Sequence, residues 1–276
     1  MTEQYAGHLQ KMATNLSDRV EYQLPLDDVW LPLNNLLGSK ISLQFVGEIH
    51  CTHCGRRRNK SFNQGYCYPC FKRLASCDTC IMSPEKCHFD QGTCREPAWA
   101  EKHCMVDHIV YFSNTSGPKI GITRNTQVPV RWIDQGATQA VPVLRVPTRK
   151  HSGLIEAAMK QHLADKTNWR ALLKGDAEQL DMEALREGFR QQIDQAVGSL
   201  PVDQQQDVQW LEQKEQHFVY PVEQYPAKIA SFNLDKNPEA SGRLLGVKGQ
   251  YMILDNGVIN IRKYTAYELA FSVASA

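Results

Sequence analysis

The chain has 276 residues and a formal net charge of +1, because 31 lysines and arginines oppose 30 aspartates and glutamates. This balance excludes the strong global field of a highly basic nucleic-acid binder, and the length allows two or three domains with at least one sizeable core. No apolar run reaches the roughly 18 residues of a membrane-spanning helix, and residues 1–20 lack the apolar region of a signal peptide. We therefore expect a soluble, cytoplasmic protein that does not enter a membrane.

Residues 1–50 predict an N-terminal segment that contains β-strands. Residues 1–19 carry a weak helical pattern, whereas residues 20–24 and 41–49 have the composition of strands. The second strand alternates Ile41, Leu43 and Phe45 with polar residues, and it runs directly into Cys51. A sheet is therefore expected to anchor the cysteine-rich unit that follows.

Residues 51–105 contain all nine cysteines. Each Cys-x-x-Cys turn directs two thiolates at one point, and two such turns complete a tetrahedron around Zn²⁺. Structural zinc supplies on the order of 10 kcal/mol to a segment that has few large apolar side chains. Four thiolates leave no position for a reacting water, so a structural, zinc-ribbon-like site is predicted from Cys51, Cys54, Cys67 and Cys70.

A second zinc ion is predicted on the later cysteines, so the chain is expected to hold one or two ions. Its predicted ligands are Cys77, Cys80, Cys87 and Cys94, with His88, His103 and Cys104 competing for the fourth position. Disulfides and buried free thiols are the alternatives. The odd number of cysteines and the absence of an export signal argue against disulfides.

The same region is rich in basic side chains. Between Cys51 and Ala75 there are six lysines or arginines and no acidic residue, and four aromatic residues are interleaved with them. This mixture suits phosphate contacts combined with base stacking. The alternative is that the cations balance the negative charge of a tetrathiolate. The predicted nucleic-acid-binding residues are Arg56, Arg57, Arg58, Lys60, Lys72 and Arg73.

Residues 106–200 predict an α/β domain with a small antiparallel sheet. Two strands, His108–Phe112 and Lys119–Thr123, flank a dense turn signal at residues 114–118 and form a β-hairpin. A helix is expected to begin near Ser152, and residues 176–198 predict a second, amphipathic helix.

An ordered set of residues in this domain resembles the signature of the GIY-YIG endonuclease superfamily. It runs over residues 106–172, about a quarter of the chain, and consists of Val110-Tyr111, Lys119-Ile120-Gly121, Arg131, Glu156 and Asn168. The wider layout resembles a bacterial zinc-binding family known as domain of unknown function 2797. That second resemblance rests on the Cys-x-x-Cys pairs and on the segments Gly92–Arg95 and Lys119–Arg124.

The first resemblance implies cleavage of a phosphodiester with one divalent metal ion. Glu156 would hold Mg²⁺ or Mn²⁺, which polarises the scissile phosphate, and Arg131 would neutralise charge on the phosphate oxygens. Tyr111 would orient or deprotonate the attacking water, and Asn168 would support the site by hydrogen bonding.

Three positions depart from the superfamily pattern, and the changes to Ile109 and Val110 in the first motif are tolerable on a strand. Lys119 replaces a tyrosine that is a main candidate for the general base there. A lysine at its ordinary pKa is protonated at neutral pH and accepts no proton unless it is desolvated, although it still binds phosphate. The sequence therefore favours either a weakened nuclease or a non-cleaving protein that binds DNA or RNA. A zinc-stabilised scaffold for a protein partner is the third hypothesis.

The rest of the chain predicts a connector over residues 201–217 and a small β-domain over residues 218–276. Asp255-Asn256-Gly257 is a strong hairpin turn between expected strands. An antiparallel barrel or sheet is expected here, packed with the strands of residues 20–49. The predicted fold class of the whole chain is α+β.

Overall fold

The computed structural model describes residues 2–274. The chain forms two compact units, each assembled from separate segments. Unit 1 comprises Met1–Lys72, Arg170–Gly175 and Val219–Ala276, and unit 2 comprises Arg73–Trp169 and Asp176–Phe218. Both units mix helices with antiparallel sheets. Within the described residues, none of the helices has the length and hydropathy that crossing a bilayer requires.

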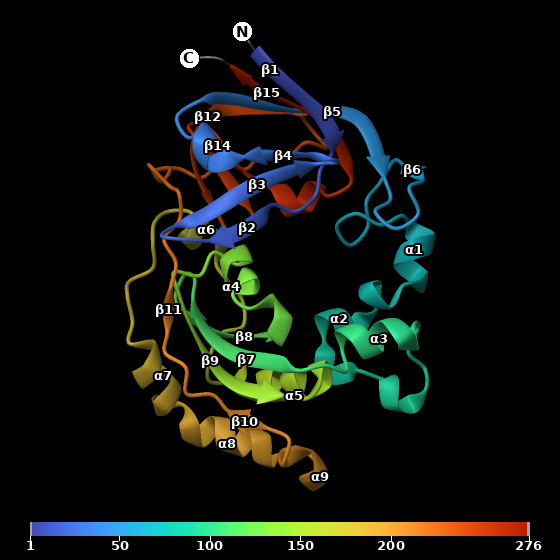
Figure 1. The fold of residues 1–276 in the computed structure, drawn as a ribbon, viewed down its shortest axis with the longest axis vertical. Coiled ribbons are helices and arrows are strands. Elements are labelled where there is room, and N and C mark those ends of the chain that lie inside the picture. The colour runs from blue at the N-terminus through green and yellow to red at the C-terminus, as the bar shows by residue number, and fades with distance from the viewer. Residues whose placement is uncertain (1, 275–276) are drawn as a thin grey trace. The chain divides into compact units, whose positions relative to one another are not determined.

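Strands from both ends of the chain lie side by side in the seven-stranded sheet of unit 1 (Figure 1). The order is β1-β15-β5-β12-β13-β14, with β6 paired to β5, and β2-β3-β4 form a separate three-stranded sheet. The strands of unit 1 are β1 (Thr2–His8), β2 (Ala13–Leu16), β3 (Val20–Leu26), β4 (Val29–Pro32), β5 (Lys40–His50), β6 (Arg57–Arg58), β12 (Glu239–Lys248), β13 (Tyr251–Leu254), β14 (Gly257–Asn260) and β15 (Tyr267–Ala274).

The predicted strand at residues 41–49 is confirmed as β5. Its apolar alternation buries Ile41 and Leu43, and Leu43 lies opposite Phe271 of β15. The helical pattern at residues 1–19 was misleading, because β1 and β2 lie there and β1 pairs residue by residue with β15. Tertiary pairing of this kind overrides a weak local propensity.

The C-terminal strands form part of an open sheet. Within the described residues the sheet has β1 and β14 at the ends of its order and does not close, so the barrel alternative was wrong and the sheet alternative holds. The predicted turn at Asp255-Asn256 joins β13 and β14. Between residues 218 and 234 of the predicted β-domain, pairing is limited to the isolated bridges Val222–Gly246 and Ser231–Val258.

Unit 2 is built on a five-stranded antiparallel sheet of order β10-β9-β7-β8, with β11 also paired to β9. The predicted hairpin is confirmed, because β7 and β8 pair in register from His108–Arg124 to Asn114–Pro118. The strands of unit 2 are β7 (His108–Asn114), β8 (Pro118–Arg124), β9 (Gln139–Val146), β10 (Gln209–Trp210) and β11 (Gln216–His217).

The helices are short. Their bounds are α1 (Tyr68–Arg73), α2 (Thr79–Met82), α3 (Pro97–His103), α4 (Val130–Asp134), α5 (Arg149–Met159), α6 (Trp169–Leu172), α7 (Met182–Gly188), α8 (Arg190–Gly198) and α9 (Val202–Gln205). The expected helix at residues 176–198 is interrupted at Phe189, which has φ −98° and ψ 7° between α7 and α8. Gly188 precedes the break, and glycine weakens a helix at this point.

The two faces of the unit 2 sheet have different partners. Val110 and Phe112 join the apolar core together with Ile155 and Met159 of α5. Alternation along β7 directs Tyr111 to the opposite face, where its ring lies 5.6 Å from that of Trp132 on α4. The sheet therefore has an apolar face and a face that carries ionisable side chains.

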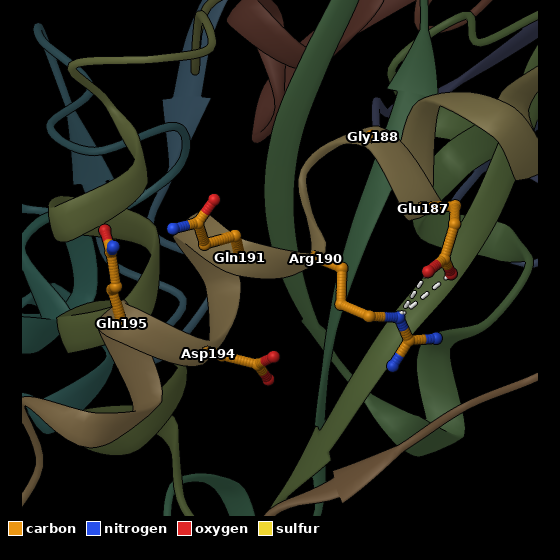
Figure 2. A pocket seen from close by; sticks show the side chains of 6 residues that line it. All are labelled: Glu187, Gly188, Arg190, Gln191, Asp194 and Gln195. Carbon is orange, nitrogen blue, oxygen red and sulfur yellow. Dashed lines mark hydrogen bonds and ion pairs between the residues drawn. The ribbon is translucent and has the colours of Figure 1, made fainter.

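A polar hollow borders α7 and α8 (Figure 2). In it, Arg190 Nε donates to both carboxylate oxygens of Glu187, at 2.7 and 2.9 Å. None of the residues predicted from the sequence as functional lines this hollow, and two of its charged groups, Glu187 and Arg190, are paired with each other. The lining residues are Glu187, Gly188, Arg190, Gln191, Asp194 and Gln195.

Candidate functional site

Four sulfur atoms converge at the end of β5 in unit 1. The Sγ atoms of Cys51, Cys54, Cys67 and Cys70 all lie within 4.8 Å of one another. β5 delivers Cys51 directly, and α1 contributes Cys70. The backbone N–H of Cys67 donates to Cys51 Sγ at 3.2 Å. This group has the composition of a closed structural zinc site, as the spacing predicts.

The charges of these four sulfurs depend on one another. Burial opposes ionisation of Cys67, but hydrogen bonds from the backbone and side chain of Cys70 lower the pKa of Cys67 to about 6. Burial and the neighbouring sulfurs raise the pKa of Cys70 to about 12. Four thiolates therefore need a cation among them, and a divalent ion supplies the charge that stabilises all four.

The predicted nucleic-acid-binding residues near this group differ in their pairing and in their exposure. Arg57 forms an ion pair with Glu48 at 2.9 Å, and Arg58 is half-buried in β6. Lys60 Nζ lies 5.5 Å from the ring centroid of Phe62, which in turn lies 5.4 Å from the ring of Tyr68. The remaining four, Arg56, Lys60, Lys72 and Arg73, are exposed.

The later cysteines lie in unit 2 and form a second group. Ligand atoms of Asp78, Cys80 and His88 lie within 4.8 Å of one another. Burial raises the pKa of Cys80, and the nearby charges of Asp78, Cys87, Cys104 and Cys94 act in the same direction. Together they bring it to about 11. The structure thus places Cys104 near three of the predicted ligands. The role of Cys77, whose Sγ lies 3.9 Å from Ser76 Oγ, stays a prediction.

Two neighbours of this second group have clear structural tasks. Asp78 accepts from Arg95 Nε at 2.8 Å and from the backbone N–H of Thr79 at the start of α2. His103 stacks on Trp99, with ring centroids 4.2 Å apart, and its Nδ1 lies 2.8 Å from the Trp99 carbonyl oxygen. Asp78 did not stand out in the sequence, because its place beside Cys80 depends on the turn that it caps.

Two of the residues that resemble the endonuclease signature, Tyr111 and Lys119, lie on the ionisable face of the β7–β8 hairpin. Tyr111 lies opposite Gly121, and Lys119 lies opposite Ser113, so both side chains share one face. Gly121 leaves room for the phenol, because a Cβ there would lie 2.6 Å from Tyr111 Oη. The Tyr111 hydroxyl donates to Gln135 Oε1 at 2.9 Å.

Electrostatics link four of these groups. Burial and the neighbouring Arg131 together lower the pKa of Lys119 to about 8, against the opposing effect of Glu156 and Asp165. Burial raises the pKa of Tyr111 to about 12 against the influence of Arg131. Burial also raises the pKa of Glu156, against the positive charges of Lys160, Arg149 and Lys119. The structure therefore brings Tyr111, Lys119, Arg131 and Glu156 together.

Asn168 is held beside the hairpin turn. α5 ends at Met159, and the chain turns back so that the N–H of Ile120 donates to the Ala164 carbonyl oxygen at 2.8 Å. The backbone N–H of Asn168 then donates to Ser116 Oγ at 2.9 Å. The asparagine side chain is exposed, and its supporting role stays a prediction.

Two polar residues of this site were missed in the sequence. Gln135 follows Arg131 by four residues, so both lie on one face of α4, and this spacing was a usable signal. Asp165 reaches Glu156 only because the chain reverses after α5, which no local pattern announces. Asp165 also forms an ion pair with Lys160 at 3.1 Å.

The residues around Glu156 limit how a divalent ion binds there. Glu156 is a single half-buried carboxylate among cations, and Asp165 is already paired with Lys160. Mg²⁺ is commonly held by one or two carboxylates together with substrate phosphates. The site therefore fits Mg²⁺ or Mn²⁺ only when a phosphate supplies further oxygen ligands.

Comparison with known proteins gives one match. A family model described as Protein of unknown function (DUF2797) matches residues 38–269, which include both cysteine groups and the hairpin site. No curated protein and no solved structure matches the chain.

Proposed function

The chain belongs to the family described as Protein of unknown function (DUF2797), and we propose that it acts on nucleic acid by binding and cleaving a phosphodiester at the hairpin site. The observation that carries this proposal is that Tyr111 and Lys119 share one face of β7–β8 and are linked electrostatically to Arg131 and Glu156, with Lys119 buried. Such a set combines phosphate-binding cations with a proton acceptor.

Lys119 is the proposed proton acceptor. This role requires a desolvated lysine, and residue Lys119 is 3% exposed with a pKa of about 8. At pH 7 about a tenth of such lysines are neutral, which is enough for general-base catalysis. Lysine then takes the task that a tyrosine performs in the superfamily that this site resembles.

The other three groups have distinct proposed tasks. Arg131 binds the phosphate oxygens and neutralises charge that develops on them. Tyr111, with a pKa of about 12, stays protonated and orients the water or the phosphate by hydrogen bonding. Glu156 would hold Mg²⁺ or Mn²⁺ together with the phosphate, and such an ion would supply Lewis-acid polarisation.

The zinc groups have a supporting part in this proposal. A structural zinc on Cys51, Cys54, Cys67 and Cys70 fixes a loop whose exposed cations and aromatic rings suit a nucleic-acid strand. A second zinc on the unit 2 cysteines stabilises the start of α5, since the N–H of Arg149 donates to the Cys104 carbonyl oxygen at 2.8 Å. That helix carries Glu156.

A non-catalytic nucleic-acid-binding protein is the second candidate function. It is favoured by the cations near Glu156, because Lys119, Arg149 and Lys160 compete with a divalent ion for the same carboxylate. In that case the site holds a phosphate without cleaving it.

The test is cleavage of a mixed set of DNA and RNA structures by zinc-loaded protein with Mg²⁺ or Mn²⁺. We expect metal-dependent products from the wild type, and a loss of at least a hundredfold in rate with Glu156→Gln. Glu178→Gln, which changes an exposed carboxylate of the same unit, is the matched control and should retain the rate. Salt-sensitive binding without cleavage by any form would support the second candidate, and absence of binding would reject both.

A further inference from the structure

Three ligating side chains from three neighbouring strands of unit 1 converge, and none of them belongs to a cysteine group, although His50 directly precedes Cys51. His8 ends β1, His50 ends β5, and Glu268 lies near the start of β15, between these two strands in the sheet (Figure 1). Ligand atoms of all three lie within 4.8 Å of one another. His8 and Glu268 are direct partners in the β1–β15 pairing.

The two imidazole rings face each other through one nitrogen each, His8 Nε2 and His50 Nδ1, which are the inner nitrogens. His8 Nε2 lies 2.7 Å from His50 Nδ1, and the rings are nearly perpendicular, at 88°, with centroids 4.6 Å apart. The backbone holds this arrangement, because the N–H of His50 donates to the Ala266 carbonyl oxygen at 3.0 Å. The N–H of Leu9 donates to the Tyr267 carbonyl oxygen at 2.9 Å.

Each ring also faces a carboxylate through its outer nitrogen. His8 Nδ1 lies 3.0 Å from Asp27 Oδ2, and His50 Nε2 lies 3.6 Å from Glu48 Oε2. A carboxylate accepts hydrogen bonds and donates none, so His8 Nδ1 carries the proton. His8 Nε2 then directs a lone pair at His50 Nδ1 across 2.7 Å, and either a proton or a metal ion between these two nitrogens satisfies it.

The pattern of neighbours is that of a metal centre. Histidine ligands of metals commonly donate their other N–H to a carboxylate, which fixes the tautomer and raises the basicity of the ligand. Asp27 occupies this position for His8, whereas Glu48 lies farther from His50, at 3.6 Å, and pairs with Arg57. Asp27 also accepts from the backbone N–H of His8 at 3.0 Å, so the supporting carboxylate is itself anchored.

We propose that His8, His50 and Glu268 bind a divalent transition-metal ion of the Zn²⁺ class, with at least one coordination position open to water or a small ligand. Two imidazoles and one carboxylate are the donor set of three-ligand sites for such ions. At metal–nitrogen distances of about 2.0 to 2.1 Å, the two nitrogens of a tetrahedral ion stand roughly 3.4 Å apart. The rings therefore separate by about 0.7 Å on binding. The site is independent of the proposed phosphodiester chemistry.

The probe is Co²⁺, added to full-length protein whose cysteine groups are already loaded with zinc. One further equivalent per chain should bind and give weak visible bands without sulfur-to-cobalt charge transfer, since the ligands are nitrogen and oxygen. In the wild type, side-chain NMR signals of His8 and His50 should be broadened or shifted by the paramagnetic ion. Absence of this extra equivalent, or binding that leaves both signals unchanged, would overturn the proposal and leave a shared proton between the rings.

Variants assign the bound ion to these residues. His50→Gln and Glu268→Gln should weaken Co²⁺ binding at least tenfold. Asp27→Asn tests the supporting carboxylate without strain, because residue 27 has φ 49° and asparagine tolerates this conformation well. It should weaken binding by about 10- to 100-fold. His217→Gln, which changes an exposed histidine paired with Glu215 at 2.8 Å, is the matched control. If the three site variants bound Co²⁺ as tightly as the wild type and the control do, the assignment would be contradicted.

Discussion

Lys119 shows how burial changes the chemistry of one side chain. Its ammonium lies in a strand among Arg131, Glu156 and Asp165, and burial lowers its pKa to about 8. The ordinary value of 10.5 belongs to the unfolded chain. Between these two values the unfolded state binds more protons, so burial of Lys119 makes stability increase as the pH rises from 8 to 10.5. Below pH 8 the full cost of burying a charge is present.

Replacing Lys119 by methionine should therefore stabilise the protein while removing activity. We expect Lys119→Met to raise the free energy of unfolding by about 1 to 3 kcal/mol at pH 7, because the desolvated charge is gone. The gain should shrink as the pH approaches 10.5. Denaturant unfolding at several pH values measures this. A variant that is destabilised at pH 7 would show that Lys119 is well paired rather than strained.

His108 provides a second pH-dependent residue. Its ring is fully buried, Nδ1 donates to the Val106 carbonyl oxygen at 2.7 Å, and burial lowers its pKa to about 4. The unfolded chain protonates this residue near 6.5, so stability is lost as the pH falls from 6.5 to 4.

His108→Phe should flatten that acid-side loss by roughly 3 kcal/mol between these two pH values. The readout is the difference in unfolding free energy between wild type and variant across the range. His162→Phe changes an exposed histidine of the same unit and serves as the control. Parallel pH profiles for the wild type and His108→Phe would contradict the assignment.

At the scale of elements, the β7–β8 hairpin positions the site. Gly121 is required because the Tyr111 phenol crosses the neighbouring strand, where a Cβ would lie 2.6 Å from the hydroxyl oxygen. This close approach, together with the Tyr111–Gln135 hydrogen bond, fixes the phenol against α4.

Gly121→Ala should cost about 1 to 3 kcal/mol of stability and displace Tyr111. NMR of the Tyr111 ring and thermal unfolding measure the two effects. Gly188→Ala is the matched control, since no atom lies within 4 Å of a Cβ there and alanine favours a helix, so it should be neutral or stabilising. If Gly121→Ala were equally benign, the phenol would not be held where the hairpin places it.

Local patterns predicted the hairpin, β5 and the start of α5, because each rests on a strong apolar alternation or a turn signal. Local patterns failed where the structure of a segment is determined by a partner far away in the sequence. β1 is a strand because β15, some 260 residues later, pairs with it. Similarly, Asp165 and Gln135 join Tyr111 and Glu156 through chain reversals. The cysteine spacing predicted which four sulfurs converge in the first group, since two turns are enough to define it, and zinc binding by them stays a prediction.

At the scale of the whole molecule, we expect the fold of residues 51–70 to depend on bound zinc. Cys54 is the exposed member of the first group, so its thiol contributes little to packing. Cys54→Ser should remove about one zinc equivalent per chain and loosen residues 51–70. His53→Gln, in the same turn, should keep the metal. Elemental analysis with hydrogen exchange measures both, and an unchanged zinc content in Cys54→Ser would contradict a site made of four thiolates.

The proposed function requires that Lys119 in the hairpin site accept a proton at neutral pH and contact a phosphate. The most direct measurement is NMR titration of the Lys119 side chain in zinc-loaded protein, followed by addition of a short oligonucleotide without divalent metal. The account predicts a pKa near 8 and a shifted Lys119 signal when the oligonucleotide binds. A pKa near 10.5, or a Lys119 signal that does not shift when the oligonucleotide is added, would contradict the proposed role of Lys119.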